Sequence, residues 1–148
     1  MDEKANSHAD HRWLSADTPV LVACGRLTEQ KNYPMMLRVV ANLQERMSVR
    51  LLILGEGPDR EALEGLAEAL KIRDLVEFVG FVEAPQAYFS KARLFISTSN
   101  WEGLPMTLIE ALYCGANFVT TDSCSAASDL TASGRFGACV ARGTPPTL

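Results

Sequence analysis

The chain has 148 residues, of which 47% are hydrophobic and 22% are charged, and its formal net charge is −4. This is enough apolar material for one globular domain with a core, and too little chain for two. The acidic balance excludes a broad basic surface for nucleic acid or for an anionic membrane, so any anion has to be captured locally.

The cysteines stand in apolar segments without a C-x-x-C pair; they are Cys24, Cys114, Cys124 and Cys139. This pattern predicts neither a zinc site nor a disulfide framework, and it indicates free thiols in a reducing compartment. No apolar run approaches the roughly 20 residues that cross a bilayer, and the polar start lacks a signal peptide. We therefore expect a soluble, cytoplasmic protein.

Residues 1–17 are polar and show no periodicity, which predicts a linker or an N-terminal arm, with the folded domain over residues 18–148. His8 and His11 belong to this arm and are expected to be solvated. A functional metal site there is not expected.

From residue 19 onward, short apolar runs alternate with amphipathic ones. Strands are predicted at 20–24, 49–54, 76–80, 94–98, 117–121 and 137–141. Helices are predicted at 35–47, 59–70, 84–91, 105–113 and 125–132, with Asp59 as a cap, Pro105 at a first helical position and Gly115 at a helix end. This alternation predicts a doubly wound, Rossmann-like α/β fold with a parallel sheet of about six strands and helices on both faces.

Ligands of such folds bind outside the carboxyl ends of the strands, where the loops converge. Four loops lie at that edge, at residues 25–32, 55–59, 80–85 and 99–105. The unusual polar residues of the sequence stand in these loops.

The first loop places two cations, Arg26 and Lys31, five residues apart after the glycine that ends the first strand. They are either a solvated pair of surface charges or a phosphate clamp, with Arg26 as a bidentate fork and Lys31 as a mobile point charge. The second loop, G-E-G-P-D, is better explained as a tight turn. It lacks the third glycine of a dinucleotide fingerprint and follows the wrong strand, so NAD is not expected.

The segment N-W-E-G-L-P-M-T-L-I-E-A-L carries Glu102 ahead of a predicted helix and Glu110 about 7 Å along it. The free N–H groups of residues 104–107 favour a phosphate at the helix start. Glu110 stands in an apolar run, where an unpartnered buried carboxylate costs several kcal/mol. It is therefore expected either to bind sugar hydroxyls, such as a ribose diol, or to be satisfied by backbone groups or by a structural arginine.

These motifs, taken together, resemble the C-terminal, donor-binding half of a GT-B glycosyltransferase of family 4, within the glycosyl transferases group 1. The E-x7-E signature is Glu102 and Glu110, and the G-R-L-x-x-x-K segment spans residues 25–31. The G-E-G-P-D turn, the V-x-F-x-G-F segment at residues 76–81 and the later T-T-D-S-C-S-A-A-S-D-L run follow in family order. The resemblance covers about residues 18–143.

The resemblance implies a role for each matching residue. Arg26 and Lys31 would bind the diphosphate of a sugar nucleotide, and Glu110 would bind the ribose hydroxyls. Glu102 would hold hydroxyls of the donated sugar, with the backbone of Gly103 and Leu104 beside the sugar and phosphate. The base would lie against the loop at residues 79–81, near Phe81. Arg26, Lys31 and Glu102 would then be the catalytic residues.

Two positions depart from the family pattern, which commonly has glycine where this chain has Ala126 and glutamate where it has Asp129. Family members also carry an N-terminal Rossmann-like domain that binds the acceptor, which this sequence lacks. The resemblance therefore implies the donor half of a retaining hexosyltransferase, inactive alone and open to self-association through an exposed face. The alternatives are a stand-alone nucleotide-sugar-binding or regulatory module, and a degenerate domain kept as an assembly surface.

Nucleotide sugar is the expected ligand, and abundance favours a UDP-sugar. No cofactor is expected beside this donor substrate. No metal is expected either, because the chain has no D-x-D pair at a strand end and Asp122 has no second acid nearby.

Overall fold

The computed structural model describes residues 11–123 and 137–140. Its strands are β1 (Val20–Cys24), β2 (Arg50–Leu54), β3 (Val76–Gly80), β4 (Leu94–Ser97), β5 (Phe118–Thr121) and β6 (Gly137–Val140). Its α-helices are α2 (Tyr33–Leu43), α3 (Arg60–Ala69), α4 (Gln86–Lys91) and α5 (Met106–Tyr113), and short 3-10 helices are η1 (Arg12–Ser15), η2 (Glu29–Lys31) and η3 (Arg73–Leu75). The helix predicted at 125–132, with Ala126 and Asp129, lies outside the described residues.

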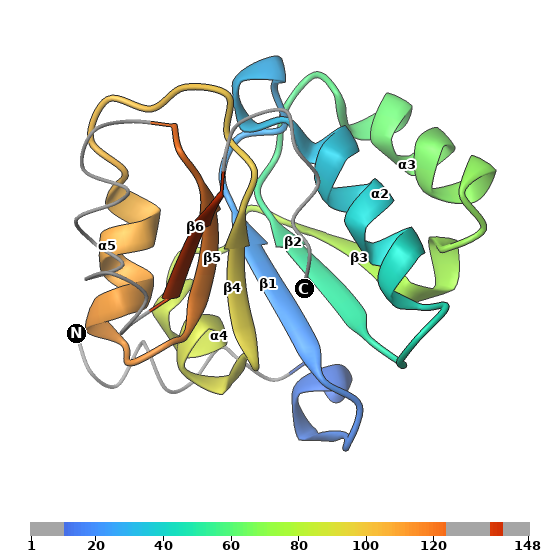
Figure 1. Ribbon diagram of the computed structural model, residues 1–148, viewed down its shortest axis with the longest axis horizontal. Coiled ribbons are helices and arrows are strands. Elements are labelled where there is room, and N and C mark those ends of the chain that lie inside the picture. Colours follow the sequence, from blue (N-terminus) through green and yellow to red (C-terminus); the bar gives the residue numbers. More distant parts are fainter. Residues whose placement is uncertain (1–10, 124–136, 141–148) are drawn as a thin grey trace.

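The six described strands form one parallel sheet in the order β3-β2-β1-β4-β5-β6. The chain builds β1, β2 and β3 toward one edge, then crosses back to place β4 on the other side of β1 (Figure 1). The strand order therefore reverses between β1 and β4, which is where a doubly wound sheet opens a crevice at its carboxyl edge. The doubly wound fold and the six parallel strands expected from the sequence are confirmed.

Two apolar cores cover the two faces of the sheet. Alternate residues of β1 and β2 point to opposite faces, so that Leu21 and Leu51 join one core while Val22 and Leu52 join the other. The first core is packed against α2 and α3, and the second against α4 and α5, as the placement of these helices in Figure 1 illustrates. Strands buried on both faces explain why the sequence reads as continuous apolar runs.

Some helix boundaries and caps differ from the expectation. Helix α2 begins two residues earlier than predicted because Pro34 fits the first turn, where its missing N–H is not needed. Asp59 stands at the start of α3 but its side chain makes no capping hydrogen bond, and Pro105 is the residue before α5 rather than its first. Among the described residues, no helix is long and apolar enough to cross a membrane.

The described part of the predicted arm is packed, contrary to expectation. Trp13 in η1 is only 5% exposed and joins the second core, where the guanidinium of Arg50 lies 5.0 Å from its ring centroid. The side chain of His11 pairs with Glu77 and accepts a hydrogen bond from the backbone N–H of Trp13. A single tryptophan buries enough apolar area to dock a segment whose other residues are polar.

Candidate functional site

Three neighbouring strands end in glycine at the carboxyl edge of the sheet. Gly25, Gly55 and Gly80 follow or close β1, β2 and β3 with φ of 150°, 144° and 92°. The backbone N–H of Gly25 donates to Leu54 O at 3.0 Å, and that of Gly55 donates to Gly80 O at 2.8 Å. The backbones of neighbouring loops therefore approach each other closely here, and a side chain would prevent this approach. A Cβ on Gly55 would lie 2.2 Å from Gly25 O.

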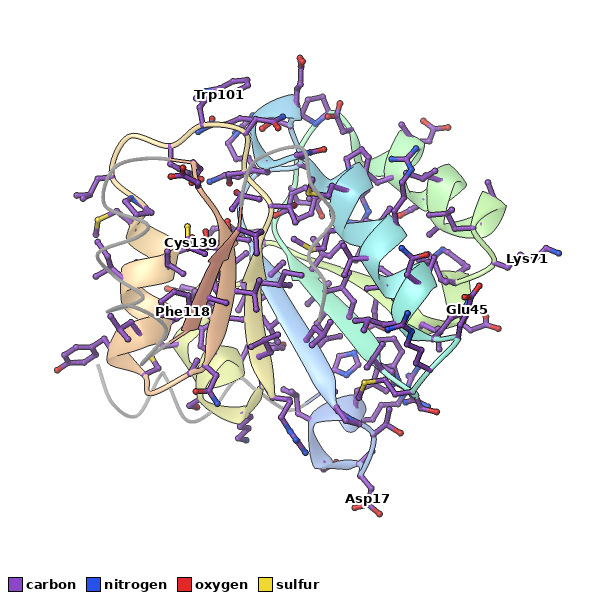
Figure 2. All side chains as sticks on the ribbon, in the orientation of Figure 1. Asp17, Glu45, Lys71, Trp101, Phe118 and Cys139 are labelled. Atoms are coloured by element: carbon purple, nitrogen blue, oxygen red, sulfur yellow. The ribbon has the colours of Figure 1, made fainter. Side chains whose placement is uncertain are left out.

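The loops after β1 and β4 are joined by hydrogen bonds across the point where the strand order reverses. The backbone N–H of Asn100 donates to Gln30 O at 2.8 Å, and the side-chain amide of Gln30 donates to Trp101 O at 3.0 Å. The Asn32 amide donates to the Asn100 side chain at 3.3 Å. Two segments about 70 residues apart in sequence thus form one structural unit at the carboxyl edge, which is the top of the molecule in Figure 2, where Trp101 is labelled.

Lys31 and Glu102 meet within this unit. Lys31 Nζ lies 2.6 Å from Glu102 Oε1, and the two side chains are only 19% and 12% exposed. The hydroxyl of Ser99 donates to the same Oε1 at 2.8 Å, and the backbone N–H of Glu102 donates to Ser123 O at 3.0 Å. The Glu102 carboxylate is thus held by two charge-assisted hydrogen bonds, one from Lys31 and one from Ser99.

Glu110 lies on α5 and is held from the neighbouring helix. The side-chain amide of Gln86, the first residue of α4, donates to Glu110 Oε2 at 3.2 Å. The described partner of Glu110 is thus a glutamine side chain, where a backbone group or a structural arginine was expected as the alternative to sugar hydroxyls. Glu110 is half-buried.

Cys24 and Tyr33 lie within the electrostatic reach of the charged groups at this edge of the sheet. Burial, with a smaller contribution from Glu110, raises the pKa of Cys24 at the end of β1 to about 11, and Lys31 acts in the opposite direction. Burial, followed by the charges of Cys24 and Glu102, raises the pKa of the Tyr33 phenol. Cys24 therefore feels the field of both Lys31 and Glu110, which come from separate loops and helices.

The other predicted site residues are more exposed. Arg26 follows Gly25 and is exposed, and its side chain forms no ion pair with residues 11–123 or 137–140. Phe81, directly after β3, is 80% exposed, and Leu104 is 65% exposed beside the exposed Gly103. These residues stand at the same carboxyl edge of the sheet, and none of them forms a described side-chain hydrogen bond with Lys31 or Glu102.

The start of α5 offers fewer free donors than the sequence analysis expected. The backbone N–H of Met106 already donates to Leu104 O at 2.9 Å, because residues 104–106 form a tight turn around Pro105. The N–H groups of Leu104 and Thr107 remain the candidates for a phosphate at this end of the helix.

Three residues that the sequence analysis did not single out organise the site. Ser99, which is 1% exposed, donates a hydrogen bond to the Glu102 carboxylate, and Gln86 donates one to the Glu110 carboxylate. The hydroxyl of Thr98 donates to the backbone carbonyl of Lys31. Their positions after β4 and at the start of α4 could have marked them as edge residues. Their partners, however, depend on contacts between segments distant in sequence.

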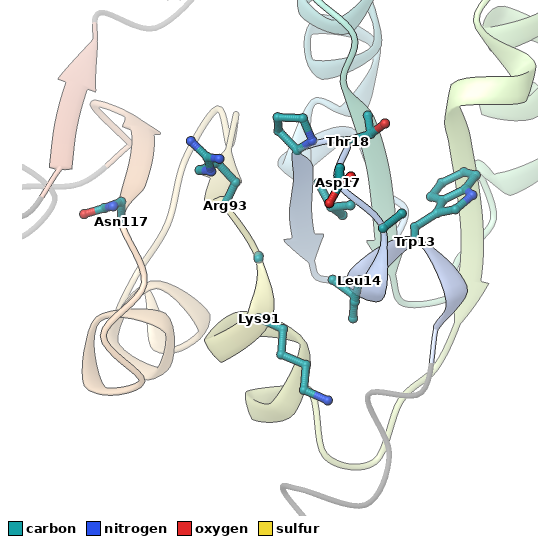
Figure 3. Close-up of a pocket in the computed structure, with 11 residues that line it drawn as sticks. Trp13, Leu14, Asp17, Thr18, Lys91, Arg93 and Asn117 are labelled. Carbon is teal, nitrogen blue, oxygen red and sulfur yellow. The ribbon is translucent and has the colours of Figure 1, made fainter.

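A separate hollow of about 350 Å³ lies at the opposite, amino end of the sheet (Figure 3). It is lined by Trp13, Asp17, Arg93 and Asn117, among others. Figure 3 shows the side chains of Lys91 and Arg93 pointing away from each other, so they do not converge on a common anion. The charged residues of the sequence motifs lie at the other end, and we therefore place the candidate site there.

Within the described ranges, no group of three histidine, cysteine, aspartate or glutamate side chains could hold a metal ion. The described cysteines, Cys24, Cys114 and Cys139, form no disulfide with one another.

Comparison with known proteins identifies the family. The family model for glycosyl transferases group 1 matches residues 7–147. The chain belongs to this family. An N-acetylgalactosamine-N,N'-diacetylbacillosaminyl-diphospho-undecaprenol 4-alpha-N-acetylgalactosaminyltransferase of Campylobacter jejuni is 34% identical over 117 residues, which make up 79% of this chain and 32% of that protein. This group 1 chain thus spans about a third of the length of the curated relatives it matches.

Solved structures agree with the family. The apo form of the lipopolysaccharide outer core galactosyltransferase WaaB matches with a TM-score of 0.78 and 28% identity, covering 88% of this chain and 38% of that one. HepE of Anabaena, in complex with UDP and glucose, matches with a TM-score of 0.83 over 98% of this chain and 40% of that one, at 19% identity. The second likeness shows the fold alone. The resemblance to a GT-B glycosyltransferase stated from the motifs is confirmed by the family match, the Campylobacter relative and WaaB.

Proposed function

We propose that this group 1 chain is the donor-binding domain of a retaining glycosyltransferase, and that its ligand is a nucleoside-diphosphate sugar. The observation that carries the proposal is the contact between Lys31 and Glu102 at the point where the strand order reverses. An ammonium group, which can bind phosphate, there lies beside a carboxylate, which can accept hydrogen bonds from hydroxyls. A sugar phosphate needs both chemistries side by side.

In this proposal, different residues of the site bind different parts of the nucleotide sugar. Lys31 and the exposed Arg26 bind the diphosphate, and the backbone of Gly103 and Leu104 lies beside the phosphate and sugar. Glu102 accepts hydroxyls of the sugar, and Glu110 accepts those of the ribose, since the Gln86 amide occupies only its Oε2. The base lies against the loop after β3, near Phe81.

In the transfer reaction, the bond between the sugar and the diphosphate breaks and negative charge develops on the departing diphosphate. Arg26 and Lys31, with the N–H groups at the start of α5, stabilise that charge. The acceptor hydroxyl attacks the anomeric carbon and loses its proton, and the donor phosphate is the proposed acceptor of that proton. Among the described residues we assign no protein nucleophile.

The names of the relatives support a hexosyl donor. The relative in Campylobacter jejuni is named as an N-acetylgalactosaminyltransferase, WaaB as a galactosyltransferase, and HepE was solved with UDP and glucose. Uridine donors are therefore the first to test. The acceptor belongs to the whole protein, and we propose that a second, N-terminal domain binds it.

Ligand-induced stabilisation tests the proposal. Thermal unfolding of the chain is followed with UDP, GDP, ADP and their hexose esters, for the wild type, Lys31→Met and the matched control Lys71→Met, which changes an exposed lysine at the far side of the molecule (Figure 2). A ligand at 100 times its dissociation constant adds about 2.7 kcal/mol of stability. We expect one nucleotide series to stabilise the wild type and Lys71→Met but not Lys31→Met. If no nucleotide stabilises the wild type, the proposed function is wrong.

A further inference from the structure

We propose that Glu102 disfavours a bare nucleoside diphosphate relative to its sugar ester, and thereby promotes release of the product that remains after transfer. The proposal rests on the proposed function, because it concerns how the same site treats the donor and the product. It gives Glu102 a second role beside the binding of sugar hydroxyls.

The carboxylate of Glu102 lies close to the place where a phosphate would bind. Lys31 Nζ and Glu102 Oε1 are 2.6 Å apart, so a phosphate oxygen that is hydrogen-bonded to Lys31 lies less than about 6 Å from that carboxylate. Both side chains are largely shielded, so their charges are screened less than those of exposed groups. The charge of Lys31 is thus already compensated before a ligand arrives.

The carboxylate is also held in place. Ser99 is 1% exposed and donates to Glu102 Oε1 at 2.8 Å, and its own carbonyl oxygen accepts a hydrogen bond from the Thr121 hydroxyl at 2.6 Å. The backbone N–H of Glu102 is bonded to Ser123 O. Glu102 is thus not free to swing away when a phosphate binds to Lys31.

The two oxygens of Glu102 differ in their contacts. Lys31 and Ser99 both contact Oε1, and Oε2 has no hydrogen-bond partner within residues 11–123 and 137–140. A sugar hydroxyl can donate to Oε2 without breaking either anchoring contact. A bare diphosphate has no hydroxyl at that position, and its terminal phosphate presents only acceptors to a carboxylate.

The charge of the ligand also differs between donor and product. A phosphate monoester loses its second proton near pH 6, so the terminal phosphate of a nucleoside diphosphate carries close to two negative charges at neutral pH. Esterification with a sugar leaves one. The product therefore meets more repulsion from Glu102 than the donor does, and it gains no hydrogen bond in return. At less than about 6 Å, one additional charge is expected to change affinity about threefold to tenfold in a site open to solvent.

The sharpest test uses a ligand that has the charge of the donor but none of its sugar hydroxyls. The β-methyl ester of UDP has the reduced charge of a donor but no sugar, so it is compared with UDP and with UDP-galactose by calorimetry on the full chain. Arg26 and Lys31 attract the additional charge of UDP in every variant that keeps them, so the quantity compared is the ratio of the two dissociation constants, UDP over methyl ester, in wild type and variant. Glu102→Gln keeps the shape and an oxygen that can accept from Lys31 and Ser99, and it removes the charge. It is expected to lower this ratio about threefold to tenfold by strengthening UDP binding.

Two further variants control the experiment. Glu29→Gln removes an exposed carboxylate from the loop that carries Lys31 and is expected to keep the wild-type ratio. Glu102→Asp retains the charge and is also expected to keep the ratio. A changed ratio in both Glu102→Gln and Glu102→Asp would therefore indicate a structural perturbation and not the loss of charge. A ratio unchanged by Glu102→Gln, with all three ligands still binding, overturns this proposal and leaves the proposed function standing. Absence of binding by all three to the wild type overturns both.

Discussion

The hydroxyl oxygen of Thr98 lies 2.8 Å from Asn32 O and 3.1 Å from Lys31 O. One buried side chain at the end of β4 therefore supports the backbone that carries Lys31, although the two residues are 67 positions apart. Asn32 itself has a left-handed φ of 49°, a conformation that asparagine tolerates better than most residues. The position of the lysine thus depends on a contact across the strand-order reversal.

We expect Thr98→Val to lower the free energy of unfolding by about 1–3 kcal/mol, because it leaves buried carbonyl oxygens without their donor. It should also weaken nucleotide binding, since the Lys31 backbone loses its support. Urea unfolding and calorimetry measure the two effects, with Thr28→Val as a control whose side chain makes no capping bond. A loss of stability with unchanged affinity would show that Thr98 does not position Lys31.

Glu110→Ala should weaken UDP by about 1.5–3 kcal/mol, the range for hydrogen bonds to a charged group. Gln86→Ala should cause a smaller loss, because it frees Glu110 to move without removing the carboxylate. Both variants should discriminate less between UDP and 2′-deoxy-UDP than the wild type does. Glu45→Ala, an exposed change far from the site, is the control, and equal losses for both nucleotides would contradict the ribose assignment (Figure 2).

Nucleotide binding should not require a divalent metal, because Arg26 and Lys31 supply the positive charge that a bridging cation would otherwise provide. Calorimetry with UDP in EDTA and in Mg²⁺ should give the same dissociation constant. Binding that disappears on chelation would show that the diphosphate clamp has been misinterpreted.

Gly55→Ala and Gly65→Ala should change stability in opposite directions. A Cβ on Gly55 would lie 2.2 Å from Gly25 O at a φ of 144°, so we expect a loss of about 3 kcal/mol or more. Gly65 lies exposed in α3 with nothing within 4 Å of an added Cβ, and alanine there should stabilise the chain by about 0.5–1 kcal/mol. Chemical denaturation of both variants decides this, and similar values would contradict the close backbone crossing.

Stability should fall at alkaline pH partly through Cys24. Its pKa is raised from 9.0 to about 11, so the folded state retains the proton over a range in which the unfolded chain loses it. The contribution is present below about pH 9 and is lost as the pH rises toward 11, with an upper size of about 2–3 kcal/mol. Urea unfolding from pH 8 to 10.5 should show a shallower decline for Cys24→Ala. Parallel declines in the two proteins would count against a protonated Cys24.

The fold was largely predictable because its strands are apolar runs, three of which end at a glycine. β1 and β3 match their predicted bounds, since Gly25 and Gly80 stop the pattern abruptly. A segment in which a single apolar residue stands among polar ones was less predictable. The single Trp13 docks a polar stretch that composition alone assigns to a linker, and only packing against Arg50 and the sheet reveals it.

The charged residues of the candidate site could be selected from the sequence, but the side chains that hydrogen-bond to them could not. Loop position and motif spacing selected Lys31 and Glu102, but their distance of 2.6 Å follows from hydrogen bonds between two loops. No local pattern indicates that Ser99 orients Glu102 or that Gln86 orients Glu110, because serine and glutamine are common in loops and helix starts. Such positioning residues become visible only when distant segments are brought together.

The chain has two tryptophans, and they report on opposite ends of the sheet. Trp13 is 5% exposed at the amino end, whereas Trp101 is 52% exposed on the loop that carries Glu102. Their fluorescence should therefore separate by wavelength, with a blue-shifted band that follows unfolding and a red-shifted band that a ligand in the crevice quenches. Replacing Trp13 with phenylalanine would leave Trp101 as a label-free optical probe of occupancy, suited to stopped-flow measurement of how fast nucleotides enter and leave.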